Sequence, residues 1–373
     1  MIHALKKIYA DFRGFDETGS AVPMMDGPLK PNMALDAAPV ALHLPDVDNL
    51  LATGDGLICS HGGDVMRLAV DGASPALTMT HLRSFSADVT CLASDGAQGL
   101  AIGVDGQGIV VEGGRHDGRQ ISTPNGELLR APTAALFLDP DTLVVAVGSA
   151  DNLVVDWKRD LMTRGSSGSI WRLSLAAKDQ QAVPLTRNLA FPYGLASAPD
   201  GSLVVTEAWR HRVIAIDPGS AKPSRVLLAD LPAYPARIVP ADDGYWLALF
   251  APRNQLVEFV LSEDAYRRRM VADIDPAYWI APALATGASF LEPIQGGARK
   301  KLNMLKPWSP SWSYGLVVRC DRLMRPLTSF HSRADGRIHG VTSLAEQGGS
   351  LFVGAKGSGV VVALDTRLEI LGQ

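Results

Sequence analysis

The sequence FPYGLASAPDGSLVVTEAWRHRVIAID, from Phe191 to Asp217, contains the pattern that decides the fold. A proline precedes a first apolar run, Asp200 and Gly201 separate it from a second, and a third ends at Asp217. Asp-Gly between alternating apolar runs is a strong hairpin signal, because the turn needs a residue that tolerates positive φ. The stretch therefore predicts three successive antiparallel strands.

The same unit recurs along the chain. Copies begin near residues 45, 88, 132, 192, 235 and 340, so most spacings are about 43 to 60 residues. Periods of about 40–50 residues with several strands in each are typical of propeller blades. We therefore predict an all-β fold, a single six-bladed β-propeller over residues 41–373. The N-terminal extension, residues 1–40, has no clear period, and the sequence allows one of its strands to close the ring.

The interval before the last copy is long because a segment of about residues 262–312 intervenes. Its first part, EDAYRRRMVADID, predicts a short helix, and its second part is rich in glycine and proline. Insertions between propeller strands map to one face, which is often the binding face. We interpret this segment as a lid, with a peripheral decoration as the alternative.

Composition limits the classes of function. The chain has 35 Lys and Arg against 39 Asp and Glu, a formal net charge of −4, which excludes a strong nucleic-acid binder. No apolar run approaches the roughly 18 residues of a membrane span, so we expect no membrane partner. No secretion signal is recognisable, which favours a cytoplasmic location. The three cysteines, Cys59, Cys91 and Cys320, are expected to be buried free thiols.

Several stretches resemble a known family. They are the segment Val155–Leu173, then FPYGLASAPDGSLVVTEAWRHRV, then LPAYPARI with GYWLALFAPRN, and finally SYGLVVRCD with VTSLAEQGGSLFVGA as a closing blade. Together they resemble the strictosidine synthase-like branch of the SMP-30/gluconolactonase and paraoxonase group, over about Pro45 to Asp365. The resemblance implies a six-bladed propeller that acts on small molecules at one mouth of its central tunnel.

The resemblance also implies where a metal ion would lie. Many hydrolases of this group hold calcium with a Glu, two Asn and an Asp at the start of the innermost strands. The matching positions here are Asp46, Thr133, Tyr193 and the pair Ala236 and Arg237. One carboxylate and one hydroxyl are too few for a calcium site, and a guanidinium opposes any cation. We therefore expect neither a metal nor another cofactor.

Arg237 is the candidate that replaces the metal. A guanidinium binds a carboxylate through two parallel hydrogen bonds, so Arg237 paired with Asp46 would close the tunnel as calcium does in the relatives. Alternatively, Arg237 is unpaired towards the mouth and binds an anionic substrate. The sequence leaves both hypotheses open, and a third in which Arg237 does neither.

Tyr193 and His339 fall at the predicted starts of inner strands, and both side chains can exchange protons. With Asp46 they form the predicted acid–base set, and the predicted substrate-binding residues are Arg237, Thr133, Trp308 and Trp312. The structural alternatives are an aromatic plug for Tyr193, a hydrogen-bonded turn residue for His339, and plain packing for the lid aromatics, which are Trp279, Trp308, Trp312 and Tyr314. The catalytic Glu of the plant namesake matches about Thr342, so that carboxylate is missing here.

The leading prediction is a metal-independent enzyme that acts on a small molecule at the tunnel mouth. Its chemistry would be hydrolysis, of the lactonase or esterase kind, or a lyase or condensation step. A non-catalytic propeller that binds a small ligand or a protein is the first alternative. The second is a calcium-dependent lactonase whose ligands lie in another register. The expected partner is a small molecule, and an anionic one if Arg237 binds it.

Overall fold

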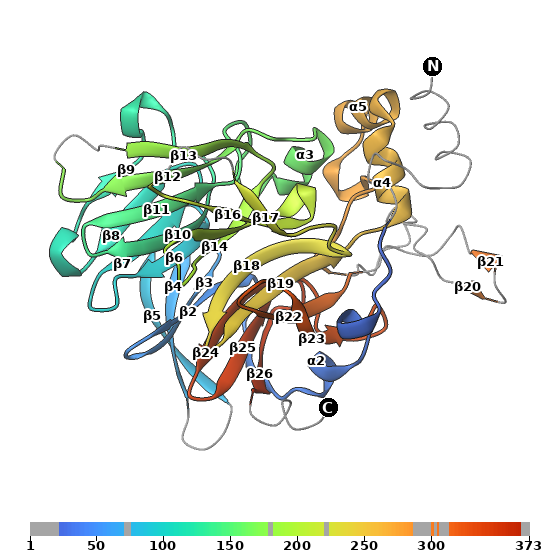
Figure 1. Cartoon of the computed structure of the whole chain (residues 1–373), viewed down its shortest axis with the longest axis horizontal. Coiled ribbons are helices and arrows are strands. Elements are labelled where there is room, and N and C mark those ends of the chain that lie inside the picture. The colour runs from blue at the N-terminus through green and yellow to red at the C-terminus, as the bar shows by residue number, and fades with distance from the viewer. Residues whose placement is uncertain are drawn as a thin grey trace.

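Four-stranded sheets repeat around a ring in the computed structural model of the chain (Figure 1). The structure describes residues 22–70, 76–177, 182–219, 224–285 and 313–366, and, between the last two ranges, only the backbone of β20 (Lys300–Lys301) and β21 (Met304–Leu305). Within these residues six sheets of four strands form the blades. The predicted six-bladed β-propeller is therefore confirmed.

The first three blades follow the chain in order. Blade one consists of β2 (Val47–Thr53), β3 (Gly56–His61), β4 (Asp64–Val70) and β5 (Leu77–Ser84). Blade two consists of β6 (Val89–Ser94), β7 (Leu100–Val104), β8 (Gly108–Glu112) and β9 (Gln120–Ile121). Blade three consists of β10 (Pro132–Asp139), β11 (Thr142–Val147), β12 (Gly168–Ser174) and β13 (Ala182–Leu189).

The other three blades complete the ring. Blade four consists of β14 (Pro192–Ser197), β15 (Leu203–Glu207), β16 (Arg212–Ile216) and β17 (Arg225–Leu228). Blade five consists of β18 (Ala233–Ala241), β19 (Gly244–Pro252), β22 (Gly315–Asp321) and β23 (Pro326–Ser332). Blade six consists of β24 (Val341–Gln347), β25 (Ser350–Ala355), β26 (Val360–Asp365) and the N-terminal strand β1 (Val40–His43).

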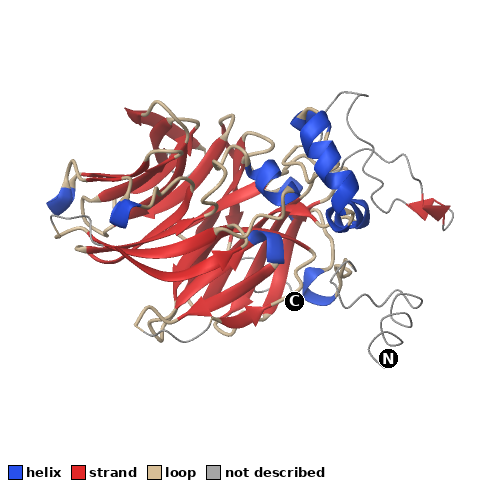
Figure 2. Ribbon diagram, turned by 90° about the horizontal axis from the view of Figure 1, so that it is seen from above, coloured by secondary structure: helices blue, strands red, loops and turns tan. Residues whose placement is uncertain are grey.

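Helices are short and lie around the strands (Figure 2). The α-helices in the described residues are α2 (Ala34–Ala37), α3 (Trp157–Met162), α4 (Gln255–Ser262) and α5 (Asp264–Asp273). Single 3₁₀ turns are η1 (Gly27–Leu29), η2 (Gly114–His116), η3 (Pro124–Gly126), η4 (Ala208–Arg210) and η5 (Pro276–Tyr278). Among the described helices, none has the length and apolar character needed to cross a membrane.

The stretch Phe191–Asp217 forms three antiparallel strands, β14, β15 and β16, as its pattern predicted. Gly201 takes a φ of +81° in the first turn, a conformation that glycine adopts without steric cost. The carboxylate of Asp200 accepts the backbone N–H of Ser202 at 3.0 Å and fixes the turn. The hairpin signal in the sequence therefore corresponds to a real turn.

The first strand of each blade contacts the first strands of its neighbours around the ring. Near its start, each of these six strands has a break in its pairing register. The residues at the breaks include Asn49, Thr90, Thr133, Tyr193, Arg237 and Thr342. A β-bulge leaves a residue unpaired and re-aims its side chain. Equivalent bulges thus set one polar or aromatic side chain per blade near the centre.

Strand β1 closes the ring by pairing with β26, the last strand of the propeller. Val40 is opposite Val362 and His43 is opposite Val360 in an antiparallel ladder. Ala41 is buried against the apolar side chains of blades one and six. The N-terminal and C-terminal parts of the chain therefore share one sheet, as β-propellers need if no edge is to remain open between the first and last blades.

The insertion in blade five begins earlier than predicted. The sequence QLVEFVL, interpreted as the third strand of a repeat, forms helix α4 instead, and β22 is the third strand of this blade. Asn254 caps the helix by accepting the N–H of Leu256 at 2.8 Å, while Val257 and Val260 are buried. SYGLVVRCD likewise belongs to blade five and not to the closing blade. The helix predicted in EDAYRRRMVADID is confirmed as α5.

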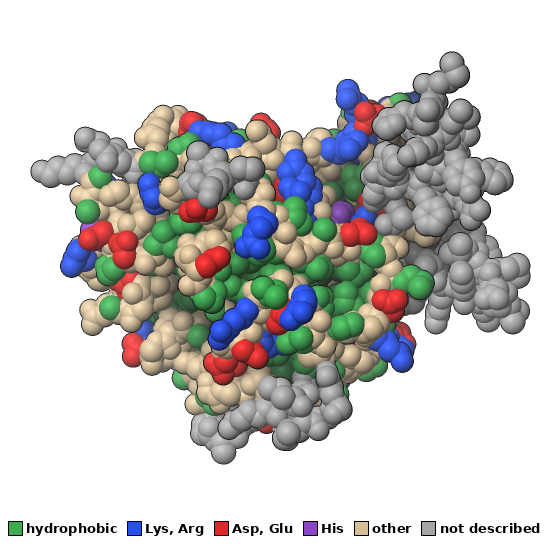
Figure 3. Space-filling model, in the orientation of Figure 1, with side chains coloured by type: hydrophobic (Ala, Val, Ile, Leu, Met, Phe, Trp, Pro, Cys, Tyr) green, Lys and Arg blue, Asp and Glu red, His purple; other side chains and the backbone are tan. Residues whose placement is uncertain are grey.

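Charges are mixed on the face of the molecule shown in Figure 3, where acidic and basic side chains alternate among apolar ones. The three cysteines are buried and free, as predicted. Their pKa values are each raised to about 12, mainly by burial, so the thiols stay protonated and unreactive.

Candidate functional site

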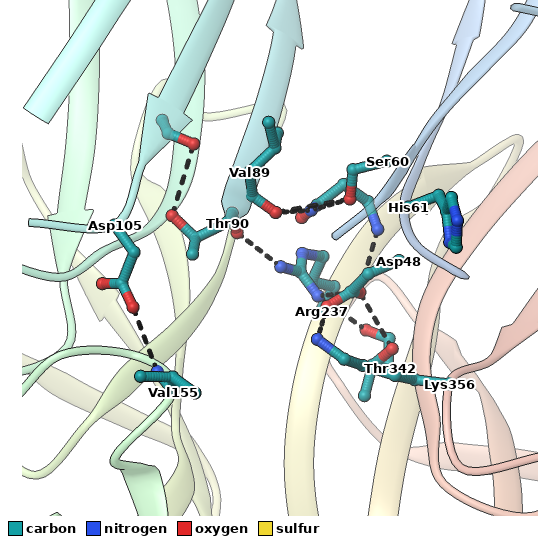
Figure 4. Close-up of polar contacts among 12 residues, drawn as sticks. Asp48, Ser60, His61, Val89, Thr90, Asp105, Val155, Arg237, Thr342 and Lys356 are labelled. Atoms are coloured by element: carbon teal, nitrogen blue, oxygen red, sulfur yellow. Dashed lines mark hydrogen bonds and ion pairs between the residues drawn. The ribbon is translucent and has the colours of Figure 1, made fainter. Parts of the chain in front are cut away.

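Arg237 connects four of the six blades at the centre of the ring (Figure 4). It projects from the bulge of β18 in blade five. Its Nη1 donates to Asp48 Oδ1 of blade one at 2.7 Å and to the carbonyl oxygen of Thr342, in blade six, at 3.3 Å. Its Nη2 donates to the carbonyl oxygen of Thr90, in blade two, at 2.7 Å. One buried cation thus connects strands that are far apart in the sequence.

Asp48 is the anionic partner of this cation. Its carboxylate also accepts the hydroxyl of Thr342 at 2.9 Å and the backbone N–H of Asn49 at 2.8 Å. Lys356 Nζ lies 3.5 Å from its second oxygen. Burial alone would raise the pKa of Asp48, but the two cations and the hydrogen bonds together lower it below its usual value. Asp48 is therefore ionised in the folded protein.

Tyr193 completes the central group from blade four. The Arg237 guanidinium lies over its ring, 5.0 Å from the ring centroid, in a cation–π arrangement. Burial, reinforced by the charge of Asp48, raises the pKa of Tyr193 above its usual value. The phenol therefore keeps its proton at neutral pH and can act as a hydrogen-bond donor.

The carboxylate that pairs with Arg237 is Asp48 and not the predicted Asp46. Asp46 has a φ of +53°, precedes β2 and is exposed. In a regular strand the side chains of residues i and i+2 point to the same side, but the positive φ of Asp46 breaks this regularity. The position of the aspartate in LPDVDN that faces Arg237 was therefore predicted wrongly. Arg237 therefore forms an ion pair, but with Asp48 and not with the predicted Asp46.

A cavity of about 190 Å³ lies beside this central group. One side is polar and is lined by Asp46, Asp48, Ser60, Asp88, Thr90 and Lys356. The other side is aromatic and is lined by Trp157, Phe191, Tyr193, Trp209 and Phe250. Apolar walls with a few convergent polar groups are the usual composition of a small-molecule site.

The aromatic side chains support one another. Trp209 stacks on Phe191 with ring centroids 4.5 Å apart, and Trp157 meets Phe250 edge-on at 5.4 Å. The indole N–H of Trp209 donates to Asp160 Oδ2 at 2.8 Å, and Asp160 is buried in helix α3. Helix α3, which contains Trp157 and Asp160, therefore helps to hold the cavity wall.

The structure brings some of the predicted site residues together and separates others. Tyr193 and Asp46 line the cavity. Thr133 is fully buried between blades, where its hydroxyl donates to the carbonyl oxygen of Pro192 at 2.5 Å. His339 borders a different surface depression and contacts Ser313 Oγ at 2.7 Å through Nδ1.

The predicted lid is described only in part. Trp308 and Trp312 lie outside the described residues. Trp279 is buried and donates its indole N–H to the carbonyl oxygen of Ile274 at 2.8 Å, which is a packing role. Leu284 lines the cavity, so the insertion does reach it.

Sequence reasoning missed most of the polar side of the cavity. Lys356 lies just after β25, and no motif marks it. Thr90 was detectable, because it occupies the same place in its blade as Thr133 and Thr342 do in theirs. Trp157 and Trp209 were not predicted as site residues, although both belong to the aromatic wall of the cavity.

No protein-family model matches the sequence, and no curated protein matches it. Two solved structures are similar in fold. A calcium-binding protein, regucalcin, from Agrobacterium tumefaciens strain C58 is 12% identical over 90% of this chain and 93% of its own, with a TM-score of 0.51. A candidate gluconolactonase is 12% identical over 88% of this chain and 91% of its own, with a TM-score of 0.52.

These similarities show that the chain shares the propeller fold of these two proteins and nothing finer. The strictosidine synthase-like branch stays a prediction. A regucalcin is described as binding calcium, so the central residues were compared with the needs of that ion. Calcium takes six to eight oxygen ligands, whereas Asp48 already binds a guanidinium at 2.7 Å. Among the described residues, no group of three or more His, Cys, Asp or Glu could hold a metal. The residues at the centre do not fit calcium.

Proposed function

We propose that this chain is a small-molecule hydrolase of the lactonase or esterase kind that works without a metal in the cavity at the tunnel mouth. The observation that carries the proposal is the pairing of two unlike walls. Asp48, which Arg237 binds from behind, and Lys356 lie on one side of a small cavity, and a packed aromatic surface lies on the other. The aromatic wall would bind the apolar part of a substrate and the charged wall would polarise its reacting group.

Lys356 is the proposed electrophile. Its side chain is 29% exposed and lines the cavity, so its ammonium group is partly shielded yet reachable. Burial, the largest single influence, would lower the pKa of Lys356, but the acidic groups Asp48, Tyr193 and Asp88 together raise it above its usual value. A permanently protonated ammonium can donate to a carbonyl oxygen and stabilise the oxyanion that forms when water adds.

Asp46 is the proposed general base, as predicted from the sequence, with Asp88 as the neighbouring carboxylate. Both are exposed at the polar side of the cavity, where water has access. The carboxylate would take a proton from the attacking water while the oxygen adds to the carbonyl carbon. When the carbon–oxygen bond breaks, the departing alkoxide would receive that proton, which leaves an acid and an alcohol.

Arg237 supplies the positive charge at the centre in the proposed metal-free mechanism. Its hydrogen bonds to Asp48, Thr90 and Thr342 all lie within the ring, which supports the structural role over the binding of an anionic substrate. The proposed role of Arg237 is therefore to hold Asp48 and the floor of the cavity in place.

A non-catalytic binding pocket is the second candidate, and the acid–base properties of the buried groups favour it. The pKa of Asp48 is lowered, while the pKa values of Tyr193 and Lys356 are raised. Each shift moves the group away from neutral pH, whereas general acids and bases are usually tuned towards it. In this reading the walls bind a ligand and release it unchanged.

Initial rates with a panel of aliphatic and aromatic lactones and esters distinguish the two candidates. We expect hydrolysis by the wild-type protein and a loss of about 100-fold in kcat for Lys356→Met, the typical effect of removing one oxyanion donor. Lys30→Met is the matched control, because Lys30 is exposed and is not among the residues that line the cavity. Quenching of tryptophan fluorescence by panel members without turnover would favour the binding pocket.

A further inference from the structure

One wall of the cavity is a connection from the neighbouring blade. The segment Ser149–Asp156 follows β11 and leads into helix α3. Its residues Val154 and Val155 line the cavity, and so does Trp157, the first residue of the helix. Val155 is 64% exposed, so side-chain packing does little to hold it. The position of this wall must be fixed through its backbone.

Asp105 makes the backbone contacts that fix this wall. It follows β7 in blade two and is only 6% exposed. Its Oδ1 accepts the N–H of Val154 at 2.9 Å. Its Oδ2 accepts the N–H of Val155 at 3.1 Å, and this second contact is drawn in Figure 4. Both oxygens therefore act as acceptors at once. A protonated carboxyl would turn an O–H towards one of the two N–H groups and lose that bond.

The first part of the segment is held by other groups. Ser149 Oγ accepts the N–H groups of Asp151 and Asn152, each at 3.1 Å. Arg130 Nε donates to the carbonyl oxygen of Ala150 at 3.0 Å. Beside the cavity, the N–H groups of Val154 and Val155 both donate to the carboxylate of Asp105. Loss of these contacts would loosen the wall beside the cavity and leave the first part of the segment in place.

The surroundings of Asp105 disfavour its charge. Burial is the largest influence and raises its pKa, and the nearby carboxylates of Asp88, before β6, and Asp156, before α3, raise it further. The N–H groups of Val154 and Val155 act in the opposite direction without cancelling these effects. Arg130 is the cation that contacts the segment, through Ala150. Asp105 therefore takes up a proton at a less acidic pH than an ordinary aspartate does.

We propose that Asp105 is a positioning residue which holds the Val154–Val155 wall in place when ionised and releases it when protonated, so that acid loosens one side of the cavity. The inference rests on the proposed function only in taking this cavity as the binding site. Protonation also removes a buried charge, so the fold as a whole is not expected to lose stability through this group. The effect is local.

Hydrogen–deuterium exchange of the full chain tests the proposal without any ligand. In the wild-type protein, the protection of the Val154 and Val155 amides, corrected for the intrinsic rate, should fall by about tenfold or more between pH 7.5 and the most acidic pH at which the amides of β15 stay protected. In Asp105→Asn, protection should already be lost to this extent at pH 7.5 and should no longer depend on pH. Asp151→Asn, the same change at an exposed position of the segment, should follow the wild-type protein.

Unchanged protection of both amides in Asp105→Asn at pH 7.5 would overturn the proposal. Protection in the wild-type protein that stays constant from pH 7.5 down to the most acidic pH at which the fold persists would overturn it too, and this second result needs no variant to fold. Amides of β15 serve as the internal reference for global opening. Because exchange needs no substrate, a failure of the proposed hydrolase activity is distinguishable from a failure of this inference.

Discussion

At the scale of single residues, the charge of Arg237 has the largest structural consequences. Its side chain is 11% exposed and that of its partner Asp48 is 5% exposed. Two charges removed from water cost several kcal/mol each, and their attraction offsets this only with close geometry and further hydrogen bonds. Thr342, Asn49 and Thr90 supply these bonds. Removing one partner of the pair is therefore costly, because it leaves the other charge buried alone. Replacing both partners by apolar side chains of the same volume need not lower the stability of the protein.

Arg237→Met should lower the free energy of unfolding by about 3–5 kcal/mol, because it leaves Asp48 buried without its main partner. Chemical denaturation at neutral pH measures this loss. Arg83→Met is the matched control, since Arg83 forms a solvent-exposed pair with Glu112 at 3.0 Å and such pairs contribute about 0–1 kcal/mol. The double variant with Asp48→Asn should recover part of the loss. Equal effects of the two single arginine variants would contradict the account.

Several residues of the central ring could be predicted from the sequence because each sits at the same place in its repeat. Thr133, Tyr193, Arg237 and Thr342 all lie at the bulges of inner strands, as their alignment to one family pattern implied. The aspartate could not be chosen correctly, because both Asp46 and Asn49 have positive φ and disturb the strand at that point. Local conformation of this kind leaves no mark in the residue pattern.

At the scale of elements, helix α4 docks on the propeller through buried polar groups. Arg253, just before the helix, binds Asp230 at 2.7 Å and Glu258 at 3.1 Å. His211, after the 3₁₀ turn η4, lies 3.8 Å from Glu258 and packs edge-on against Tyr234. The pKa of His211 is lowered to about 3, because burial and the charge of Arg253 both oppose its protonation.

This lowered pKa predicts a loss of stability in mild acid. The unfolded chain binds a proton at His211 near the ordinary value of 6.5, whereas the folded protein does so only near 3. Stability is therefore fully present above pH 6.5 and falls as the pH decreases, by at most about 1.4 kcal/mol per pH unit for this group. Burial raises the pKa of Glu258, so protonation of Glu258 in acid favours the folded protein and opposes the effect of His211. This opposing effect grows in more acidic solution, so measurements between pH 7.5 and 5 are the most informative for His211.

His211→Phe, which keeps an aromatic ring against Tyr234, should reduce this slope. Urea denaturation from pH 7.5 to pH 5 gives the free energy of unfolding of both proteins. The difference between them should be constant above pH 6.5 and should shift in favour of the variant below it. Curves that stay parallel down to pH 5 would show that His211 is not held neutral by the fold.

The same element shows a limit of prediction from sequence. QLVEFVL is apolar enough for a buried strand, and strand and helix are hard to distinguish in so short a run. The segment forms a helix because Asn254 caps its N-terminus and because Val257 and Val260, three residues apart, are both buried. In the sequence, the hairpin before it suggested that a third strand would follow at once, and the insertion delayed that strand to β22.

At the scale of the whole molecule, the ring depends on contacts between distant parts of the chain. Arg237 and Asp48 are 189 residues apart, and Thr342 and Asp48 are 294 apart. Repeat spacing predicted the six blades because each blade is a local unit. The cavity could not be predicted in the same way, since its walls come from several blades whose side chains meet only when the ring closes.

Closure by β1 should therefore determine the stability of the whole ring. Ala41→Asp places a carboxylate at a position that is 5% exposed, which should cost several kcal/mol and lower the melting temperature strongly. Val40→Asp is the matched control in the same strand, because Val40 is 38% exposed and should tolerate the change with a small effect. Calorimetry compares the two variants. Similar melting temperatures would mean that the pairing of β1 with β26 contributes little.

We propose that the Arg237 guanidinium holds the centre of the ring, beside a cavity that hydrolyses small molecules without a metal. The most direct measurement is the initial rate of hydrolysis of the lactone and ester panel by wild-type protein treated with EDTA, with and without millimolar Ca²⁺. The account predicts hydrolysis of at least one member at the same rate in both conditions. Hydrolysis that requires Ca²⁺, or no hydrolysis of any member in either condition, would contradict it.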